Sequence, residues 1–267
     1  MNEKEIGSLL PEIVNIARQA GERILAVYET DFDVQTKEDT SPLTAADLAA
    51  HETILAGLKK LTPGWPILSE EAAEIGFEIR SGWSRYWLVD PLDGTREFVN
   101  RNGEFTVNIA LVDDHRPVLG VVHVPVSGRD YFACRESGAW RQDSGEEPVS
   151  IKASITCRRP VRVVGSKSHR GSSLDAFLER LGDYELVPMG SSLKICLVAD
   201  GSADIYPRLG PTSEWDTAAA QAVVEVAGGQ MTNIDGEAIR YNQKADMLNP
   251  FFLVFGDSSV DWSRLLT

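Results

Sequence analysis

The sequence predicts a mixed α/β (α+β) fold, and two observations lead to this prediction. In the first half of the chain, strand-like runs follow one another across short polar turns such as 113–116, which is typical of an antiparallel sheet. From about residue 160, strands and helices alternate, which indicates an α/β layer packed on the first half. We therefore expect two halves, 1–157 and 158–267, that meet in a polar stretch near Pro160.

Each element is predicted from its own residues. Apolar side chains recur at helical spacing from Ile6 to Val27, so we expect a helix over about 3–29. A second helix is expected over about 43–61, capped by Ser41 or Thr44. The strands expected in the first half are 65–69, 84–90, 104–113, 117–125 and 129–134. In the second half we expect strands at 161–165, 184–188, 203–206, 229–232 and 251–255, and helices at 171–181, 191–200 and 213–227.

The composition is that of an ordinary globular protein, with 43% hydrophobic and 25% charged residues. This excludes a disordered chain, a collagen-like chain and a coiled coil.

Three widely spaced cysteines favour a reducing cytosol over a disulfide framework or a zinc ribbon. No apolar run approaches the roughly 20 residues that span a bilayer, and the charged N-terminus is unlike a signal peptide. We therefore expect a cytoplasmic protein without a transmembrane segment.

The net charge restricts the partners of the protein. There are 26 Lys and Arg residues against 40 Asp and Glu residues, a formal charge of −14. Nucleic-acid binding relies on Lys and Arg against phosphate, so we expect no nucleic-acid partner. The charge argues against any anionic ligand, unless divalent metal ions hold it, because the ions reverse the local sign.

The densest chemical signal lies where an apolar strand ends at Asp90 and a second acid, Asp93, follows three residues later. Pro91 between them restricts the backbone and stiffens the bend. The two carboxylates and the carbonyl oxygen of Leu92 are oxygen ligands, the type that Mg²⁺ prefers. A turn with two helix-capping aspartates explains this spacing equally well.

The residues that follow are suited to an anion. Gly94 lets the backbone approach a ligand closely, because it has no Cβ. Thr95 is expected to cap a short helix over 96–100, whose free N–H groups would face the anion.

Further acids lie at other predicted element ends. Glu70 and Glu71 follow a predicted strand, Ser213-x-x-Asp216 resembles a capping box, and Asp47 lies on the second helix near a Thr hydroxyl. Each has a simpler explanation, as a solvated turn, a helix cap or a surface acid. Two carboxylates ~5 Å apart repel by about 3 kcal/mol at an effective dielectric of 20. If these acids converge, we therefore expect either raised pKa values or a bound cation.

A separate group of residues is suited to anion recognition. Gly165–His169 and Gly190–Lys194 each join a Gly/Ser turn to a predicted helix, and Arg208 follows a predicted strand. Arg can hold a phosphate through two hydrogen bonds, and Lys acts as a point charge. Helix capping and solvated cations are the alternative explanation.

These motifs resemble those of the lithium-sensitive, Mg²⁺-dependent inositol monophosphatase superfamily. The resemblance lies in Ser69-Glu70-Glu71, in Asp90-Pro91-Leu92-Asp93-Gly94-Thr95, and in Trp215-Asp216 with its small-residue helix and Gly228-Gly229. Arg96-Glu97-Phe98, the segment 101–108, Gly190–Lys194 and Asp204–Arg208 resemble the bacterial 3′(2′),5′-bisphosphate nucleotidases of this superfamily. The resemblance implies a five-layer αβαβα sandwich with the site between the two halves.

The resemblance also implies the metal ligands. Glu70, Asp90 and the Leu92 carbonyl would bind one Mg²⁺, and Asp90, Asp93 and Asp216 a second. Two or three ions are implied, with Mn²⁺ as a substitute and Li⁺ as an inhibitor. Most ligands belong to the first half of the chain and Asp216 to the second.

The implied catalytic and substrate residues complete this site. Asp47 and Thr95 would polarise the attacking water, with help from Glu70. The N–H groups of Gly94 and Thr95 would hold the scissile phosphate. The residues similar to those that hold the nucleotide and its second phosphate are His169, Ser191, Lys194 and Arg208.

The expected reaction is hydrolysis of adenosine 3′,5′-bisphosphate to AMP and phosphate, with two metal ions activating water. The family links this reaction to sulfate assimilation, and some relatives associate with the cytoplasmic face of the inner membrane. An inositol or sugar phosphatase of the same superfamily is the alternative. A haloacid-dehalogenase-like phosphatase fits poorly, because its Asp-x-Asp lies near the N-terminus, and a non-catalytic regulator would not need the full acid set. The sequence does not predict the oligomeric state.

Overall fold

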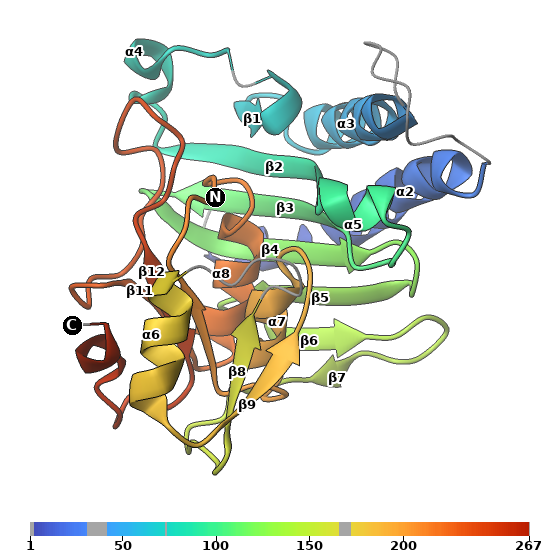
Figure 1. The fold of residues 1–267 in the computed structure, drawn as a ribbon. Coiled ribbons are helices and arrows are strands. Elements are labelled where there is room, and N and C mark those ends of the chain that lie inside the picture. The colour runs from blue at the N-terminus through green and yellow to red at the C-terminus, as the bar shows by residue number, and fades with distance from the viewer. Residues whose placement is uncertain (1–2, 31–41, 73, 166–171, 267) are drawn as a thin grey trace.

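The computed structural model describes residues 3–30, 42–72, 74–165 and 172–266. Within these ranges the chain forms two β-sheets, one of seven strands and one of five, with helices between and outside them (Figure 1). The expectation of a mixed α/β fold is therefore confirmed.

The first sheet has the strand order β1-β2-β3-β4-β5-β6-β7. Its strands are β1 (Ile67–Ser69), β2 (Arg85–Asp93), β3 (Thr106–Asp113), β4 (Arg116–Val124), β5 (Arg129–Cys134), β6 (Gly138–Gln142) and β7 (Val149–Ser150). All neighbours are antiparallel except β1 and β2, which run parallel. Of the five strands predicted in this half, β2 to β5 are antiparallel neighbours as expected, while β1 runs parallel to β2 at one edge.

The second sheet has the order β11-β12-β10-β8-β9. Its strands are β8 (Val161–Gly165), β9 (Tyr184–Pro188), β10 (Ile205–Arg208), β11 (Gln230–Asn233) and β12 (Phe252–Phe255). β8 is parallel to β9 and β10, as strand–helix alternation predicts, and β12 is antiparallel to both of its neighbours.

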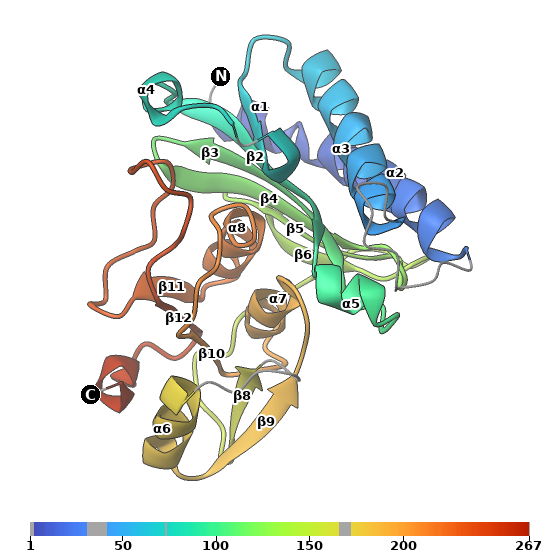
Figure 2. The same cartoon turned by 45° about the horizontal axis from the view of Figure 1, so that its top comes forward.

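Helices complete five layers, which are visible in Figure 2. α1 (Glu3–Gly7), α2 (Leu10–Tyr28) and α3 (Pro42–Leu61) cover the outer face of the first sheet, α7 (Leu193–Ala199) and α8 (Ala218–Val226) lie between the sheets, and α6 (Ser172–Leu181) covers the second sheet. Three apolar cores fill the spaces between these layers within the described residues. One contains Trp87, the second Tyr131 and the third Phe177. The arrangement is the αβαβα sandwich that the family resemblance implies.

Short elements connect these layers. They are the 3₁₀ helices η1 (Glu70–Ala72) and η2 (Trp262–Leu265) and the helices α4 (Phe77–Arg80) and α5 (Thr95–Val99). Of these, the sequence predicted only α5. Among the described residues, no helix is both long and apolar enough to cross a lipid bilayer.

Several predicted boundaries need correction. The helix expected over 3–29 is two helices, because Pro11 in the first turn of α2 has no N–H with which to continue α1. The helix expected over 213–227 begins only at Ala218. Strands β6 and β7 were not predicted. The proposed cap Ser41 lies outside the described residues, and the division into halves at 157/158 stays a prediction.

Candidate metal and phosphate site

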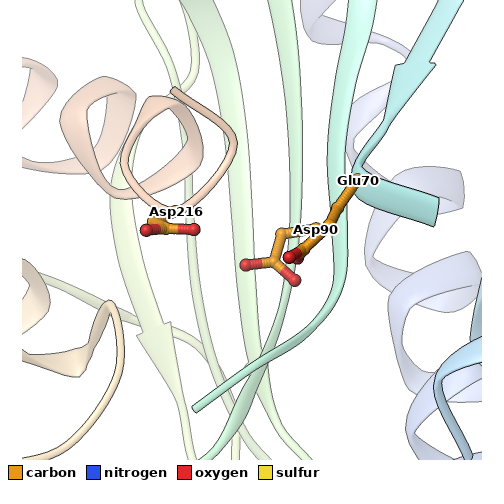
Figure 3. Close-up of side chains that lie close together, drawn as sticks. All are labelled: Glu70, Asp90 and Asp216. Atoms are coloured by element: carbon orange, nitrogen blue, oxygen red, sulfur yellow. The ribbon is translucent and has the colours of Figure 1, made fainter. Parts of the chain in front are cut away.

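Three carboxylates from separate elements meet between the two sheets. Glu70 begins η1 directly after β1, Asp90 lies in β2, and Asp216 lies in the turn before α8. Each offers a carboxylate oxygen within 4.8 Å of the others. Figure 3 shows the three side chains pointing toward one another. The expected convergence of these distant acids is therefore present.

Asp90 is the most buried member of this group, with 1% of its surface exposed. Its Oδ1 accepts a hydrogen bond from the N–H of Leu92 at 3.1 Å, and within the described part of the chain its Oδ2 has no partner. Burial raises the pKa of Asp90 well above its ordinary value, and the charges of Asp93, Asp216, Glu70 and Asp47 raise it further. An unpartnered buried carboxylate oxygen of this kind is well suited to a cation.

Asp93 ends β2 and is held by donors from both halves of the chain. Its Oδ2 accepts hydrogen bonds from the backbone N–H of Ser192 and, at 3.4 Å, from the side-chain amide of Asn108. The Ser192 hydroxyl lies 2.9 Å from the Asn108 side-chain oxygen. Burial raises the pKa of Asp93, while the charge of Lys194 and these two donors oppose the rise. The carboxylate is thus fixed in orientation beside the acid group.

Asp47 is buried on α3, unlike the surface acid that its polar neighbourhood suggests. Burial raises the pKa of Asp47 to about 8, and the charges of Glu71 and Glu70 and a hydrogen bond with Glu71 contribute. Its Oδ1 has no hydrogen-bond partner among the described residues. Glu71, which the sequence analysis treated only as a neighbour of Glu70, therefore belongs to the surroundings of this site.

The other acids of the group show the same electrostatic conflict. Burial raises the pKa of Asp216 to about 7, and the negative charges of Asp93 and Glu70 contribute, although the Ser213 N–H and Arg208 oppose them. Burial also raises the pKa of Glu70. Like charges held together in a buried space favour either protonation or a bound cation. Oxygen ligands and unpartnered buried carboxylate atoms together fit a divalent metal ion.

A cavity of about 590 Å³ opens beside the acids. Among its lining residues are five that the sequence analysis assigned to substrate, namely Gly94, Thr95, Ser191, Lys194 and Arg208. Asp93 lines this cavity and also a smaller one that reaches Asp216. His169 lies outside the described residues. The cavity is also lined by residues for which no substrate contact was predicted, namely Arg96, Glu97, Ser173, Leu174 and Leu209–Pro211.

The backbone brings Gly94 and Ser191 close together in this cavity. Gly94 has φ +92°, and a Cβ built on it would lie 3.3 Å from the Cβ of Ser191. Gly94, not Thr95, is the N-cap of α5, so the predicted cap is wrong by one residue. Thr95 is instead the first residue of α5 and faces the cavity. A glycine is needed here because the position is left-handed and crowded.

Two of the cations that line the cavity, Lys194 and Arg208, are held differently. The ammonium of Lys194 lies 5.8 Å from the centre of the Tyr206 ring, and burial lowers the pKa of Lys194. The guanidinium of Arg208 donates hydrogen bonds to the Thr212 hydroxyl and to the Pro211 carbonyl at 2.7 Å. Both cations line the cavity, so positive charge lies directly beside the acidic group.

The comparisons with known proteins agree with this geometry. A sequence model described as "Inositol monophosphatase family" matches residues 8–254. The 3′(2′),5′-bisphosphate nucleotidase CysQ of Escherichia coli strain K12 is 48% identical over 248 residues, covering 92% of this chain and 99% of that protein. The crystal structure of CysQ from Bacteroides thetaiotaomicron, described as a bacterial member of the inositol monophosphatase family, has 41% identity and a TM-score of 0.82, covering 92% of this chain and 96% of that one. An inositol monophosphatase structure from Anabaena (Nostoc) sp. PCC 7120 has 25% identity and a TM-score of 0.78, covering 98% and 96%.

Proposed function

The chain belongs to the inositol monophosphatase family, and we propose that it is a 3′(2′),5′-bisphosphate nucleotidase that hydrolyses adenosine 3′,5′-bisphosphate to AMP and phosphate. The observation that carries this proposal is the cavity in which an acidic metal-ligand group adjoins Lys194 and Arg208. A substrate with two phosphates needs both parts, because one phosphate must reach the acids while the other meets protein cations. The high similarity to two CysQ proteins supports the same choice.

For the cofactor we propose Mg²⁺, in two or three ions, with Mn²⁺ as a substitute. Glu70, Asp90 and the Leu92 carbonyl would hold one ion, and Asp90 would share a second with Asp93 and Asp216. When bound, such ions supply positive charge against the phosphate and lower the pKa of water. Hydrogen bonds already orient the carboxylates of Asp90 and Asp93, so these two ligands need little rearrangement.

The residues around the acids would perform the remaining steps. Asp47, which is buried beside Glu70 and Glu71, would accept a proton from the attacking water. The Thr95 hydroxyl would orient that water. The N–H groups of Gly94 and Thr95 at the start of α5 would hold the scissile phosphate. No nucleophilic side chain is needed, because water attacks the phosphorus in line with the leaving oxygen.

The second phosphate and the nucleoside would lie at the other side of the cavity. Lys194 and Arg208 would bind the phosphate that is not cleaved, and Ser191 would bind the nucleotide beside them. His169 is proposed for the same role from the family resemblance alone. An inositol ring carries no second phosphate, so these cations favour a bisphosphate nucleotide over inositol phosphate.

A side-by-side turnover assay tests this function. Adenosine 3′,5′-bisphosphate, the corresponding phosphosulfate and inositol 1-phosphate are compared at equal concentration with Mg²⁺. We expect the bisphosphate to have the highest kcat/KM. A preference for inositol 1-phosphate would support the inositol phosphatase alternative, and absence of phosphate release from all three would favour a non-catalytic regulator.

We also propose that the protein acts in the cytoplasm. The described structure contains all three cysteines, Cys134, Cys157 and Cys196, and each is free. Free cysteines are typical of a reducing compartment. Localisation of a tagged full-length chain by cell fractionation tests this, and it also reveals any association with the inner membrane.

A further inference from the structure

The turn that carries Asp216 is held by a distant loop, and its own helix begins only two residues later. The side-chain amide of Asn249 donates to the Ser213 carbonyl at 2.8 Å and to the Thr217 hydroxyl at 2.9 Å. The N–H of Glu214 donates to the Met247 carbonyl at 2.7 Å. The position of Asp216 therefore depends on where residues 242–249 lie.

Glu214 makes a second connection to this loop. Its carboxylate is buried, with 2% of the residue exposed, and accepts a hydrogen bond from the N–H of Asn242 at 2.8 Å. Asn242 has φ +57°, a left-handed conformation that Asn adopts more readily than most residues. The loop is thus attached to the Asp216 turn at both of its ends, by Asn242 and by Asn249.

Arg80 attaches the same loop to the first sheet. It lies at the end of α4, shortly before β2, and only 2% of it is exposed. Its guanidinium donates to the Asn242 side-chain oxygen and to the carbonyls of Lys244, at 3.0 Å, and Ala245. The Asn242 amide donates in return to the Arg80 carbonyl. In Figures 1 and 2 the loop after β11 reaches up to α4, away from the second sheet from which it starts.

The buried charges in this network balance one another. The positive charge of Arg80 stabilises the Glu214 carboxylate and opposes the effect of burial on it. Asn242 lies between them and bonds to both. Because Asn242 bonds to both Arg80 and Glu214, the three residues form one connected unit.

We propose that Arg80, Asn242 and Glu214 are positioning residues that set Asp216 against Asp90 and Glu70 and thereby raise the affinity for the divalent ion. None of the three lines either cavity next to the acids, so they act through Asp216 and not by touching substrate. The two halves of the chain contribute different ligands, Asp90 from the first sheet and Asp216 from the turn before α8. This network ties those two parts together, and the inference rests on the proposed metal site.

Direct metal binding tests this inference without reference to turnover. Calorimetric titration with MgCl₂, and with MnCl₂ as the tighter-binding probe, compares the wild-type chain with Asn242→Gly. Glycine tolerates the φ of +57° but removes both side-chain bonds to Arg80. We expect affinity for the ion to fall by up to about 10-fold, the lower end of the loss typical of a ligand's direct partner, because Asn242 acts through the turn that carries the ligand. At saturating metal, KM for the nucleotide is expected to stay at the wild-type value.

Arg18→Met is the matched control. Arg18 also bonds a buried acid, Asp130, and a neighbouring amide, Gln142, but it lies on α2 away from the Asp216 turn. Arg18→Met is expected to lower the unfolding temperature without changing metal affinity.

Unchanged affinity in Asn242→Gly overturns the inference. If that variant does not fold, Arg80→Lys decides instead, because lysine keeps the charge but lacks the planar guanidinium whose two nitrogens bond to Asn242 and to the two carbonyls. Wild-type affinity in Arg80→Lys would overturn the inference. A wild-type chain that binds no metal would overturn the metal site itself.

Discussion

Among single residues, Asp93 is the position at which the charge of a proposed ligand can best be tested apart from its role in packing. Its carboxylate is oriented by donors on both halves of the chain, yet its neighbours Ser192 and Asn108 also bond to each other. Asp93→Asn keeps the shape of the side chain and one acceptor oxygen, so the surrounding contacts remain satisfied. We expect the protein to fold while kcat/KM falls by about 100-fold or more, because a lost ligand costs at least as much as a lost partner of a ligand.

The measurement for this variant is steady-state turnover at several Mg²⁺ concentrations, together with thermal unfolding. Asp183→Asn, which changes an exposed acid in the same way, is the control and should have wild-type activity. Full turnover by Asp93→Asn would contradict the assignment of Asp93 as a ligand.

Substitution of Lys194 tests whether this residue binds the phosphate that is not cleaved. Lys194 lines the cavity beside Arg208, and its ammonium lies over the Tyr206 ring. We expect Lys194→Ala to raise KM for adenosine 3′,5′-bisphosphate about 10- to 100-fold, since a hydrogen bond to a charged group contributes about 1.5–3 kcal/mol. KM for a nucleoside monophosphate should change less. The comparison uses both substrates, with the exposed Lys152→Ala as the control; equal losses for both substrates would count against the nucleotide assignment.

At the scale of elements, the placement of α8 depends on a glycine in the strand beneath it. A Cβ built on Gly120 of β4 would meet the backbone carbonyl of Ala219, and would lie 2.9 Å from the Cβ of Ala222. Because α8 directly follows the Asp216 turn, a displacement of this helix would also move a metal ligand. Close packing of strand and helix here is therefore a condition for the site.

Gly120→Ala should for this reason affect both stability and metal binding. We expect the free energy of unfolding to fall by about 1–3 kcal/mol, the usual cost of overpacking a core, and Mg²⁺ affinity to weaken. Urea unfolding and calorimetry measure the two effects. Gly64→Ala is the control, because no atom lies within 4 Å of a Cβ at that position. If Gly120→Ala unfolds at the wild-type urea concentration, α8 does not depend on this contact.

For the whole molecule, the sequence predicted local elements better than their boundaries and contacts. The apolar periodicity of residues 3–29 correctly predicted helix, but it did not predict the break that Pro11 causes. Strand β7 has two exposed residues and was not predicted, since it has no apolar alternation to detect.

Among the candidate site residues, Asp90 and Asp93 could be predicted from the sequence, because their spacing occurs together with Pro91 and Gly94. Asp47 was not distinguished from a surface acid, because its burial and its proximity to Glu70 and Glu71 arise only when the separate segments pack together. The network of Arg80 and Asn242 joins positions 162 residues apart, which no local pattern reveals.

The excess of 14 negative charges gives the folded protein a stability that depends on both pH and metal. Burial and neighbouring acids raise the pKa of Asp47 from 3.8 to about 8 and that of Asp216 to about 7 in the folded chain. Between about pH 4 and pH 8, these two acids therefore bind more protons in the metal-free folded state than in the unfolded state. Their contribution to the free energy of unfolding is greatest below this range and is lost as pH rises through it.

A bound divalent ion should reverse this trend, because it takes the place of those protons and requires ionised carboxylates. We expect the increase in Tm on adding MgCl₂ to be small near about pH 5 and several degrees larger near about pH 8, since only the folded state binds the ion. Thermal unfolding with EDTA and with excess Mg²⁺, at each pH, measures the difference and cancels titrations elsewhere in the protein. The double variant Asp47→Asn, Asp216→Asn, which removes two of these acids and one proposed ligand, should show a smaller increase in Tm near about pH 8 than the wild-type chain. An increase in Tm that is the same at both pH values would mean that these acids do not exchange protons for metal.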